Sequence, residues 1–172
     1  MCAAYARRNT NRYPGYDYTQ PGAYFITLCA FNHEPLFGTV RDGKVYNSAC
    51  GQIVNSEWLR STEVRNELVI DCFIVMPNHF HALLLLVGPP TEVPELAIWP
   101  LRPKRALGSL VAGFKAAVTK RTHEQGLLVG QDIWQRNYYD HIVRDHANFE
   151  RIQEYILTNP ARWESDRFYR QM

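Results

Sequence analysis

The apolar stretch from Val75 to Val87 is the feature that most constrains this fold, and only Pro77, Asn78 and two histidines interrupt it. Pro77 cannot donate to a strand ladder, so it is expected to end one strand, and Asn78 favours a turn. Residues 79–87 are rich in aliphatic side chains, end before Gly88, and are too few to span a membrane. The stretch therefore predicts a buried central strand that pairs antiparallel with the strand before the turn.

Two histidines share one face of this predicted strand. Side chains alternate across a strand, so His79 and His81 point to the same side. The apolar residues that point to the other side are Phe80, Ala82, Leu84 and Leu86. Two imidazoles separated by two residues lie roughly 7 Å apart along a strand, close enough to hold one metal ion. A His-x-His pair on a strand is more often structural than ligating, so the metal interpretation depends on the rest of the chain.

Length and composition indicate the broad class. The 172 residues, 46% hydrophobic and 21% charged, are typical of one soluble globular domain with a buried core. The N-terminus lacks the apolar segment of a secretory signal, and the four cysteines lack the paired spacing of zinc sites. We therefore expect a cytoplasmic protein with reduced thiols.

Positive charge is concentrated at the two ends of the sequence. Residues 1–20 have a net charge of +2, residues 21–99 of −4 and residues 100–172 of +4. This distribution is a mild signature of polyanion binding, although it is also common in proteins that bind no polyanion.

Periodicity and turn signals divide the chain into strands and helices. Residues 1–20 are expected to form an extended arm, and residues 88–104, with five of the ten prolines, a loop. The other expected elements are a strand at 23–31, a hairpin turning at Asp42-Gly43, a helix capped by Asn47 or Ser48, strands at 67–76 and 79–87, a helix from 106 to about 125, short strands or irregular segments at 133–135 and 138–143, and a helix from near 145 to 159. This order predicts an α+β domain with an antiparallel sheet covered by helices.

The last predicted helix supplies two side chains that suit a metal site. Tyr155 and Asn159 are four residues apart and therefore neighbours on one helical face. If that face packs over the two histidines, Asn159 offers an amide oxygen as a ligand and a tyrosine lies beside the metal. A phenol, with a pKa of about 10, becomes a useful nucleophile when its proton is withdrawn. Imidazole and oxygen ligands suit Mg²⁺ or Mn²⁺ on a phosphodiester, so the pattern predicts DNA transesterification through a tyrosyl phosphate.

Other interpretations of these residues stay open. Tyr155 alone is equally a helix-interface tyrosine. Tyr138 and Tyr139 lack an amide four residues later, so we interpret them as packing or DNA-contacting residues. The candidate DNA contacts are Arg12, Lys115, Lys120, Arg121, Arg136 and Arg144. Lys115, Lys120 and Arg121 on the predicted helix are equally consistent with a solvent-exposed face that contacts no DNA. Arg136 and Arg144 flank an aromatic segment, which suits base stacking together with phosphate contact.

The segment Met76-Pro77-Asn78-His79-Phe80-His81 resembles the His-hydrophobic-His motif of single-tyrosine HUH transposases, and more narrowly of the REP-associated tyrosine transposases. The resemblance covers nearly the whole chain in the right order. The other similar segments are residues 14–27, 108–115, 133–144 and the tyrosine helix at 155–160.

This resemblance implies a ferredoxin-like HUH nuclease fold and a substrate of single-stranded DNA, often an imperfect hairpin from repetitive extragenic palindromic elements. It implies that His79, His81 and Asn159 hold Mg²⁺ or Mn²⁺ and that Tyr155 is the nucleophile. Cleavage would leave a 5′-phosphotyrosine and a free 3′-hydroxyl. Related insertion-sequence transposases have glutamine at the position of Asn159. Relatives include dimers and monomers, so both states stay open.

The expected organisation is an arm at 1–20, one HUH transposase domain at 21–165 and a tail at 166–172. Two alternatives to an active transposase remain. One is a domesticated nucleic-acid-binding module without strand transfer, and the other is a His-x-His metallohydrolase of small molecules. The first needs no tyrosine nucleophile, and the second predicts no binding of DNA.

Overall fold

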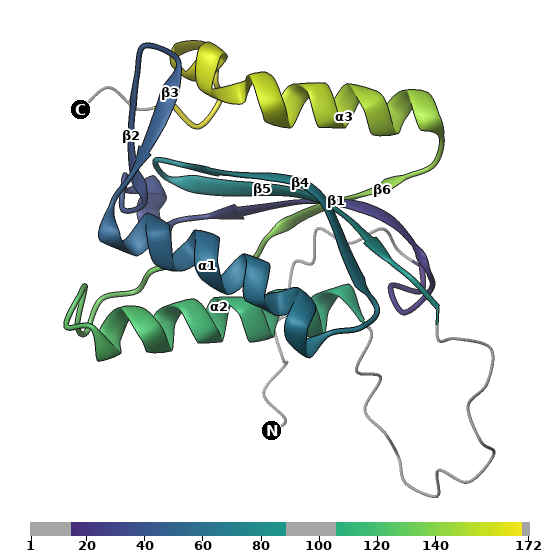
Figure 1. The fold of residues 1–172 in the computed structure, drawn as a ribbon, viewed down its shortest axis with the longest axis horizontal. Helices are drawn as coiled ribbons and strands as arrows, with labels where there is room; N and C mark the ends of the chain where they lie inside the picture. Colours follow the sequence, from purple (N-terminus) through teal and green to yellow (C-terminus); the bar gives the residue numbers. More distant parts are fainter. Residues whose placement is uncertain (1–14, 89–105, 170–172) are drawn as a thin grey trace, which may run out of the picture.

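The histidine strand is an inner strand of a four-stranded antiparallel sheet with the order β4-β5-β1-β6. The computed structural model describes residues 15–88 and 106–169. The sheet consists of β1 (Gly22–Cys29), β4 (Leu68–Met76), β5 (His79–Leu86) and β6 (Tyr139–Val143). Helices α1 (Ala49–Val64) and α2 (Leu107–Glu124) cover one face of the sheet, and α3 (His146–Thr158) covers the other (Figure 1). The predicted α+β architecture is confirmed.

β4 and β5 form the hairpin that the sequence predicts. The turn at Pro77-Asn78 places Met76 opposite His79, and β5 then pairs with β1 along its other edge. β5 is hydrogen-bonded to a neighbouring strand along both edges, so the direction of each of its side chains is fixed.

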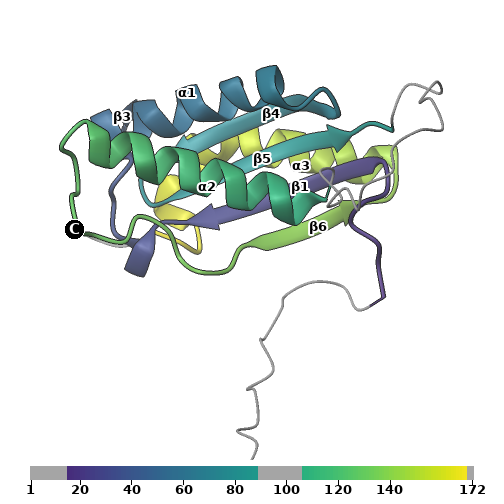
Figure 2. The same cartoon turned by 90° about the horizontal axis from the view of Figure 1, so that it is seen from below.

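The two faces of β5 bury different sets of residues. The face formed by Phe80, Ala82, Leu84 and Leu86 packs into the main core with α1 and α2, which lie side by side across the sheet in Figure 2. On the opposite face, Leu83 packs against Ile152 and Ile156 of α3. This second, smaller cluster fixes α3 over the strand that carries the two histidines.

Helix boundaries follow the expected signals. Ser48 caps α1 by accepting a hydrogen bond from the Gly51 amide, and Asp145 caps α3 by accepting one from the Asn148 amide. The last helix was expected to end at Asn159. Instead the α-helix ends at Thr158 and a 3₁₀ helix, η2 (Asn159–Ser165), continues the chain, because proline is tolerated in the first turn of a helix.

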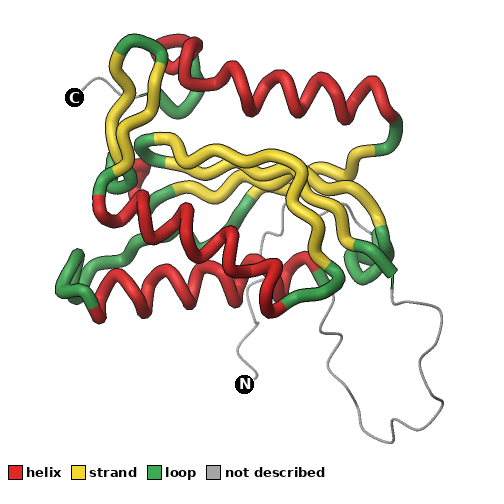
Figure 3. The backbone as a smooth tube through the Cα atoms, viewed as in Figure 1, coloured by secondary structure: helices red, strands yellow, loops and turns green. Residues whose placement is uncertain are grey.

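A two-stranded ribbon lies beside this last turn. β2 (Gly38–Arg41) and β3 (Lys44–Asn47) pair with Val40 opposite Val45, as the Asp42-Gly43 turn predicts. Figure 3 shows the ribbon next to the chain that follows α3. Between β1 and β2, a short 3₁₀ turn, η1 (Phe31–His33), leads away from the sheet.

The predicted N-terminal arm is only partly within the described residues. Its end is not extended: residues 18–20 form a turn, and Tyr18 is buried against the rings of Tyr16 and Tyr24. Arg12 and nearly all of the proline-rich loop at 88–104 lie outside the described residues. No helix within residues 15–88 and 106–169 is long and apolar enough to cross a membrane.

Candidate active site

β5 presents His79 and His81 side by side beneath α3. Both imidazoles are fully buried, and their ring centroids are 4.5 Å apart. The packing of α3 on Leu83 brings Tyr155 above them, with its hydroxyl oxygen 3.3 Å from His81 Nε2. The structure therefore brings together the histidines and the tyrosine that the sequence singled out.

Hydrogen bonds fix the tautomer of His79. The side-chain amide of Asn78 donates through Nδ2 to the carbonyls of Phe168 and His33, at 2.8 and 3.2 Å. Its Oδ1 therefore faces His79 Nδ1, 2.9 Å away, and can only accept from it. Nδ1 carries the proton, so the lone pair of His79 is on Nε2. That nitrogen is buried and has no hydrogen-bond partner among the described residues.

His81 is oriented by β1. Its Nδ1 lies 2.8 Å from the hydroxyl oxygen of Thr27, directly opposite it in the sheet. In the tautomer whose Nδ1 donates to Thr27, the lone pair is on Nε2, which faces the Tyr155 hydroxyl. Hydrogen bonds of this kind from the far ring nitrogen are typical of histidines that ligate metals.

Burial keeps both imidazoles neutral. It lowers the pKa of His79 to about 4, against a smaller opposing effect of the Asp166 carboxylate. Burial, the neighbouring His79 and Arg167 hold the pKa of His81 well below its ordinary value. Neutral imidazole is the form that binds a metal ion. Burial, and next the charge of Asp166, raise the pKa of Tyr155, so the phenol is protonated at neutral pH.

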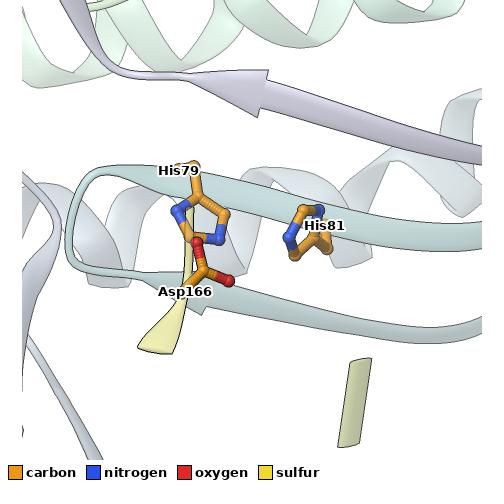
Figure 4. Close-up of side chains that lie close together, drawn as sticks. All are labelled: His79, His81 and Asp166. Carbon is orange, nitrogen blue, oxygen red and sulfur yellow. The ribbon is translucent and has the colours of Figure 1, made fainter. Parts of the chain in front are cut away.

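Asn159 and Asp166 complete the cluster. Asn159 Nδ2 donates to Asp166 Oδ2 over 2.9 Å, while Asn159 Oδ1 is buried without a hydrogen-bond partner in the described parts of the chain. His79, His81 and Asp166 each offer one ligand atom, and these atoms lie within 4.8 Å of one another. Figure 4 shows the Asp166 carboxylate beside the two imidazoles of β5.

These side chains fit a divalent cation. Two buried atoms with free lone pairs, His79 Nε2 and Asn159 Oδ1, are costly unless something binds them. A set of imidazole nitrogens, an amide oxygen and a carboxylate is one that Mg²⁺ or Mn²⁺ accepts.

Sequence reasoning missed Asp166, which it assigned to a tail outside the domain. After α3, the 3₁₀ helix η2 turns the chain back, so that Asp166 and Phe168 lie against the histidines. The Phe168 ring is buried, 4.6 Å from the ring of His79. Neither residue belongs to a periodic pattern, so the sequence carries no signal for this contact.

Three of the candidate DNA contacts lie away from this site. Lys115, Lys120 and Arg121 lie on α2, which covers the opposite face of the sheet from the histidines. The Lys115 ammonium donates to the carbonyls of Gln135 and Asn137, at 2.7 and 3.1 Å. Burial lowers its pKa to about 8.

The other cations differ in their surroundings. On α2, Lys120 pairs with Glu124 and Arg121 with Glu57, whereas Arg136 and Arg144 are exposed around β6.

The side chains of Tyr138 and Tyr139 lie on opposite faces of the sheet. Tyr138 packs against the main core. Tyr139 is opposite Thr27, which is in turn opposite His81, so Tyr139 lies on the histidine face and is half-exposed.

Comparison with known proteins agrees with this fold. No family model matches the chain. It is 33% identical over 169 residues to an uncharacterised protein of Haemophilus influenzae, covering 94% of this chain and 93% of that protein. A solved structure of a REP-associated tyrosine transposase bound to a REP hairpin superposes with a TM-score of 0.60 at 21% identity, covering 88% of this chain and 73% of the other. The chain therefore belongs to the same family as the Haemophilus influenzae protein, and it has the transposase fold that its sequence resembles.

Proposed function

We propose that this protein is a metal-dependent endonuclease and strand transferase of single-stranded DNA, a transposase in which Tyr155 is the nucleophile. One observation carries the proposal: the Tyr155 hydroxyl lies 3.3 Å from His81 Nε2, in a cluster whose buried His79 Nε2 and Asn159 Oδ1 have no partner among the described residues. A tyrosine with only a packing role has no need of these unpartnered ligand atoms.

His79, His81 and Asn159 would hold the divalent cation, with Asp166 as a further ligand or as the group that orients Asn159. The cation would draw charge from the scissile phosphate and favour the ionised form of the phenol. The two imidazoles are held by Thr27 and Asn78, so the site is organised before substrate binds.

In the proposed reaction the phenolic oxygen of Tyr155 attacks phosphorus, and the bond from phosphorus to the 3′ oxygen breaks. The electron pair of that bond stays on the 3′ oxygen, which takes a proton and becomes a free hydroxyl. The tyrosine remains joined to the 5′ phosphate. Asp166 Oδ2 lies 3.4 Å from the phenol oxygen and is the carboxylate placed to receive its proton.

The solved transposase with the same fold is bound to a REP hairpin. We therefore propose a DNA hairpin, from a repetitive extragenic palindromic element, as the substrate of this chain.

A labelled hairpin oligonucleotide incubated with the protein and Mn²⁺ tests the function. The expected result is a covalent protein–DNA band that resists denaturation, is lost in Tyr155→Phe, and persists in Tyr138→Phe and Tyr139→Phe. Binding of hairpins without any covalent band would instead identify a nucleic-acid-binding module. Absence of both binding and cleavage would contradict each of these readings.

A further inference from the structure

Arg167 lies at the edge of the active site, and its guanidinium is held by aromatic rings. Its Cζ is 4.4 Å from the ring centroid of Phe168 and 5.3 Å from that of Tyr139. Contacts of a guanidinium with two rings fix its position without using its hydrogen-bond donors.

Those donors have no partner within the described part of the chain. Within residues 15–88 and 106–169, Arg167 has no salt bridge and no side-chain hydrogen bond, and its side chain is exposed. An arginine in this condition presents up to five N–H groups in a planar fork that matches the geometry of a phosphate.

The backbone on both sides of Arg167 is fixed to the site. Asp166 accepts hydrogen bonds from the side chain of Asn159 and from the backbone amide of Phe168, at 2.9 and 2.7 Å. The Phe168 carbonyl accepts from Asn78, the residue that orients His79. The guanidinium is therefore anchored through the same residues that arrange the metal ligands.

Arg167 is near the reacting groups. Tyr139, Thr27 and His81 are directly opposite one another on three adjacent strands and share one face. The Arg167 guanidinium, which lies over the Tyr139 ring, is therefore next to the row of side chains formed by Tyr139, Thr27 and His81. Its positive charge also lowers the pKa values of His79, His81 and Tyr155, so it lies within electrostatic range of all three.

We propose that Arg167 is a catalytic residue that binds a non-bridging oxygen of the scissile phosphate, with Tyr139 and Phe168 holding its guanidinium in place. The inference rests on the proposed function. Arg167 transfers no proton; it neutralises charge that builds on the phosphate oxygens while the Tyr155 oxygen bonds to phosphorus and the 3′ oxygen leaves.

The test combines variants of Arg167 with oligonucleotides that carry one neutral methylphosphonate linkage. Arg167→Gln and Arg167→Lys are compared with wild type in single-turnover formation of the covalent product. Arg60→Gln is the matched control, because Arg60 is also an exposed arginine and lies on α1, under the opposite face of the sheet.

The expected result is a loss of roughly 10- to 100-fold in rate for Arg167→Gln on the all-phosphate hairpin, a smaller loss for Arg167→Lys, and none for Arg60→Gln. The loss for Arg167→Gln should shrink when the scissile linkage itself is neutral, and remain when only a flanking linkage is neutral. That coupling locates the contact at the reacting phosphate.

Two outcomes overturn the inference while leaving the proposed function intact. One is covalent product from Arg167→Gln at the wild-type rate. The other is a rate loss that couples to a flanking linkage rather than to the scissile one. If wild type and all variants bind the hairpin but form no covalent product, the proposed function itself fails. Circular dichroism and the urea midpoint of each variant establish that the rates refer to folded protein.

Discussion

The side-chain amide of Asn159 donates to the Asp166 carboxylate across 2.9 Å, while the amide oxygen of Asn159 is buried with no hydrogen-bond partner in the described residues. An amide that donates from Nδ2 in one direction presents Oδ1 in the other. In the proposed site, Asp166 would therefore hold Asn159 in the orientation that offers the metal an oxygen rather than a nitrogen.

Replacement of Asp166 is expected to weaken metal binding. In Asp166→Ala the Asn159 amide loses the hydrogen bond that holds its orientation, and the site loses a carboxylate that lies close enough to the two histidines to bind the same ion. The affinity for Mn²⁺ should therefore fall about 10- to 100-fold. Isothermal titration calorimetry measures the change. Glu164→Ala is the control, because Glu164 is a nearby exposed acid outside the cluster. Equal affinities in the two variants would show that Asp166 does not organise the ligands.

Asn78 is expected to matter for stability as well as for metal binding. Asn78→Ala removes the acceptor for His79 Nδ1 and leaves the buried Phe168 carbonyl without its donor. The free energy of unfolding should fall by about 1–3 kcal/mol, and Mn²⁺ affinity should fall because the imidazole is no longer held in one tautomer. Urea denaturation and calorimetry measure the two effects. Ser56→Ala, which removes a half-buried hydrogen bond on α1, is the matched control and should leave Mn²⁺ affinity unchanged.

The sequence predicts the strand pair, the two faces of β5 and the tyrosine helix because each has a strong period or a sharp boundary. The alternation after Pro77 assigns His79 to one face unambiguously. Asp166 and Phe168 are different, because their positions depend on contacts such as the one between Asn78 and Phe168, 90 residues apart. Similarly, helical spacing places Lys115 on the surface of α2, whereas the carbonyls that engage its ammonium come from another segment. Local patterns carry no information about such long-range partners.

The metal-free protein should lose stability as pH falls from about 6.5 toward 4. The pKa of His79 is lowered from 6.5 to about 4 in the folded state, so between these values the unfolded chain binds a proton that the folded chain excludes. The contribution of His79 to the free energy of unfolding is fully present above pH 6.5. Below that pH it is lost at up to about 1.4 kcal/mol per pH unit. Urea unfolding at pH 5, 6 and 7 gives the slope. His79→Asn should reduce the slope to the part that comes from His81, whose pKa is also lowered, whereas His146→Asn, which alters an exposed histidine, should not reduce it. Equal slopes in the two variants would contradict the burial argument.

The cluster that holds α3 against β5 should control both folding and the position of Tyr155. Ile156→Ala removes a fully buried side chain from contact with Leu83, and should reduce the free energy of unfolding by about 2–5 kcal/mol. Leu157→Ala, one residue later and 65% exposed, should change it by less than about 0.5 kcal/mol. Chemical denaturation measures both. Similar losses in the two variants would mean that this face of α3 is not what anchors the helix.

Lys115 is expected to support the fold rather than bind DNA. Its ammonium donates to the carbonyls of Gln135 and Asn137, which join α2 to the segment before β6, and it lies over the ring of Trp134. Lys115→Gln should therefore lower the free energy of unfolding by about 1–3 kcal/mol, while Lys120→Gln, on an exposed turn of the same helix, should leave it nearly unchanged. A lysine that neutralises a phosphate releases counterions, so its loss reduces the salt dependence of DNA affinity by close to one unit in log–log slope. Fluorescence anisotropy with a labelled hairpin at several salt concentrations should give the wild-type slope for Lys115→Gln. A slope reduced by about one would instead place this ammonium on the DNA backbone.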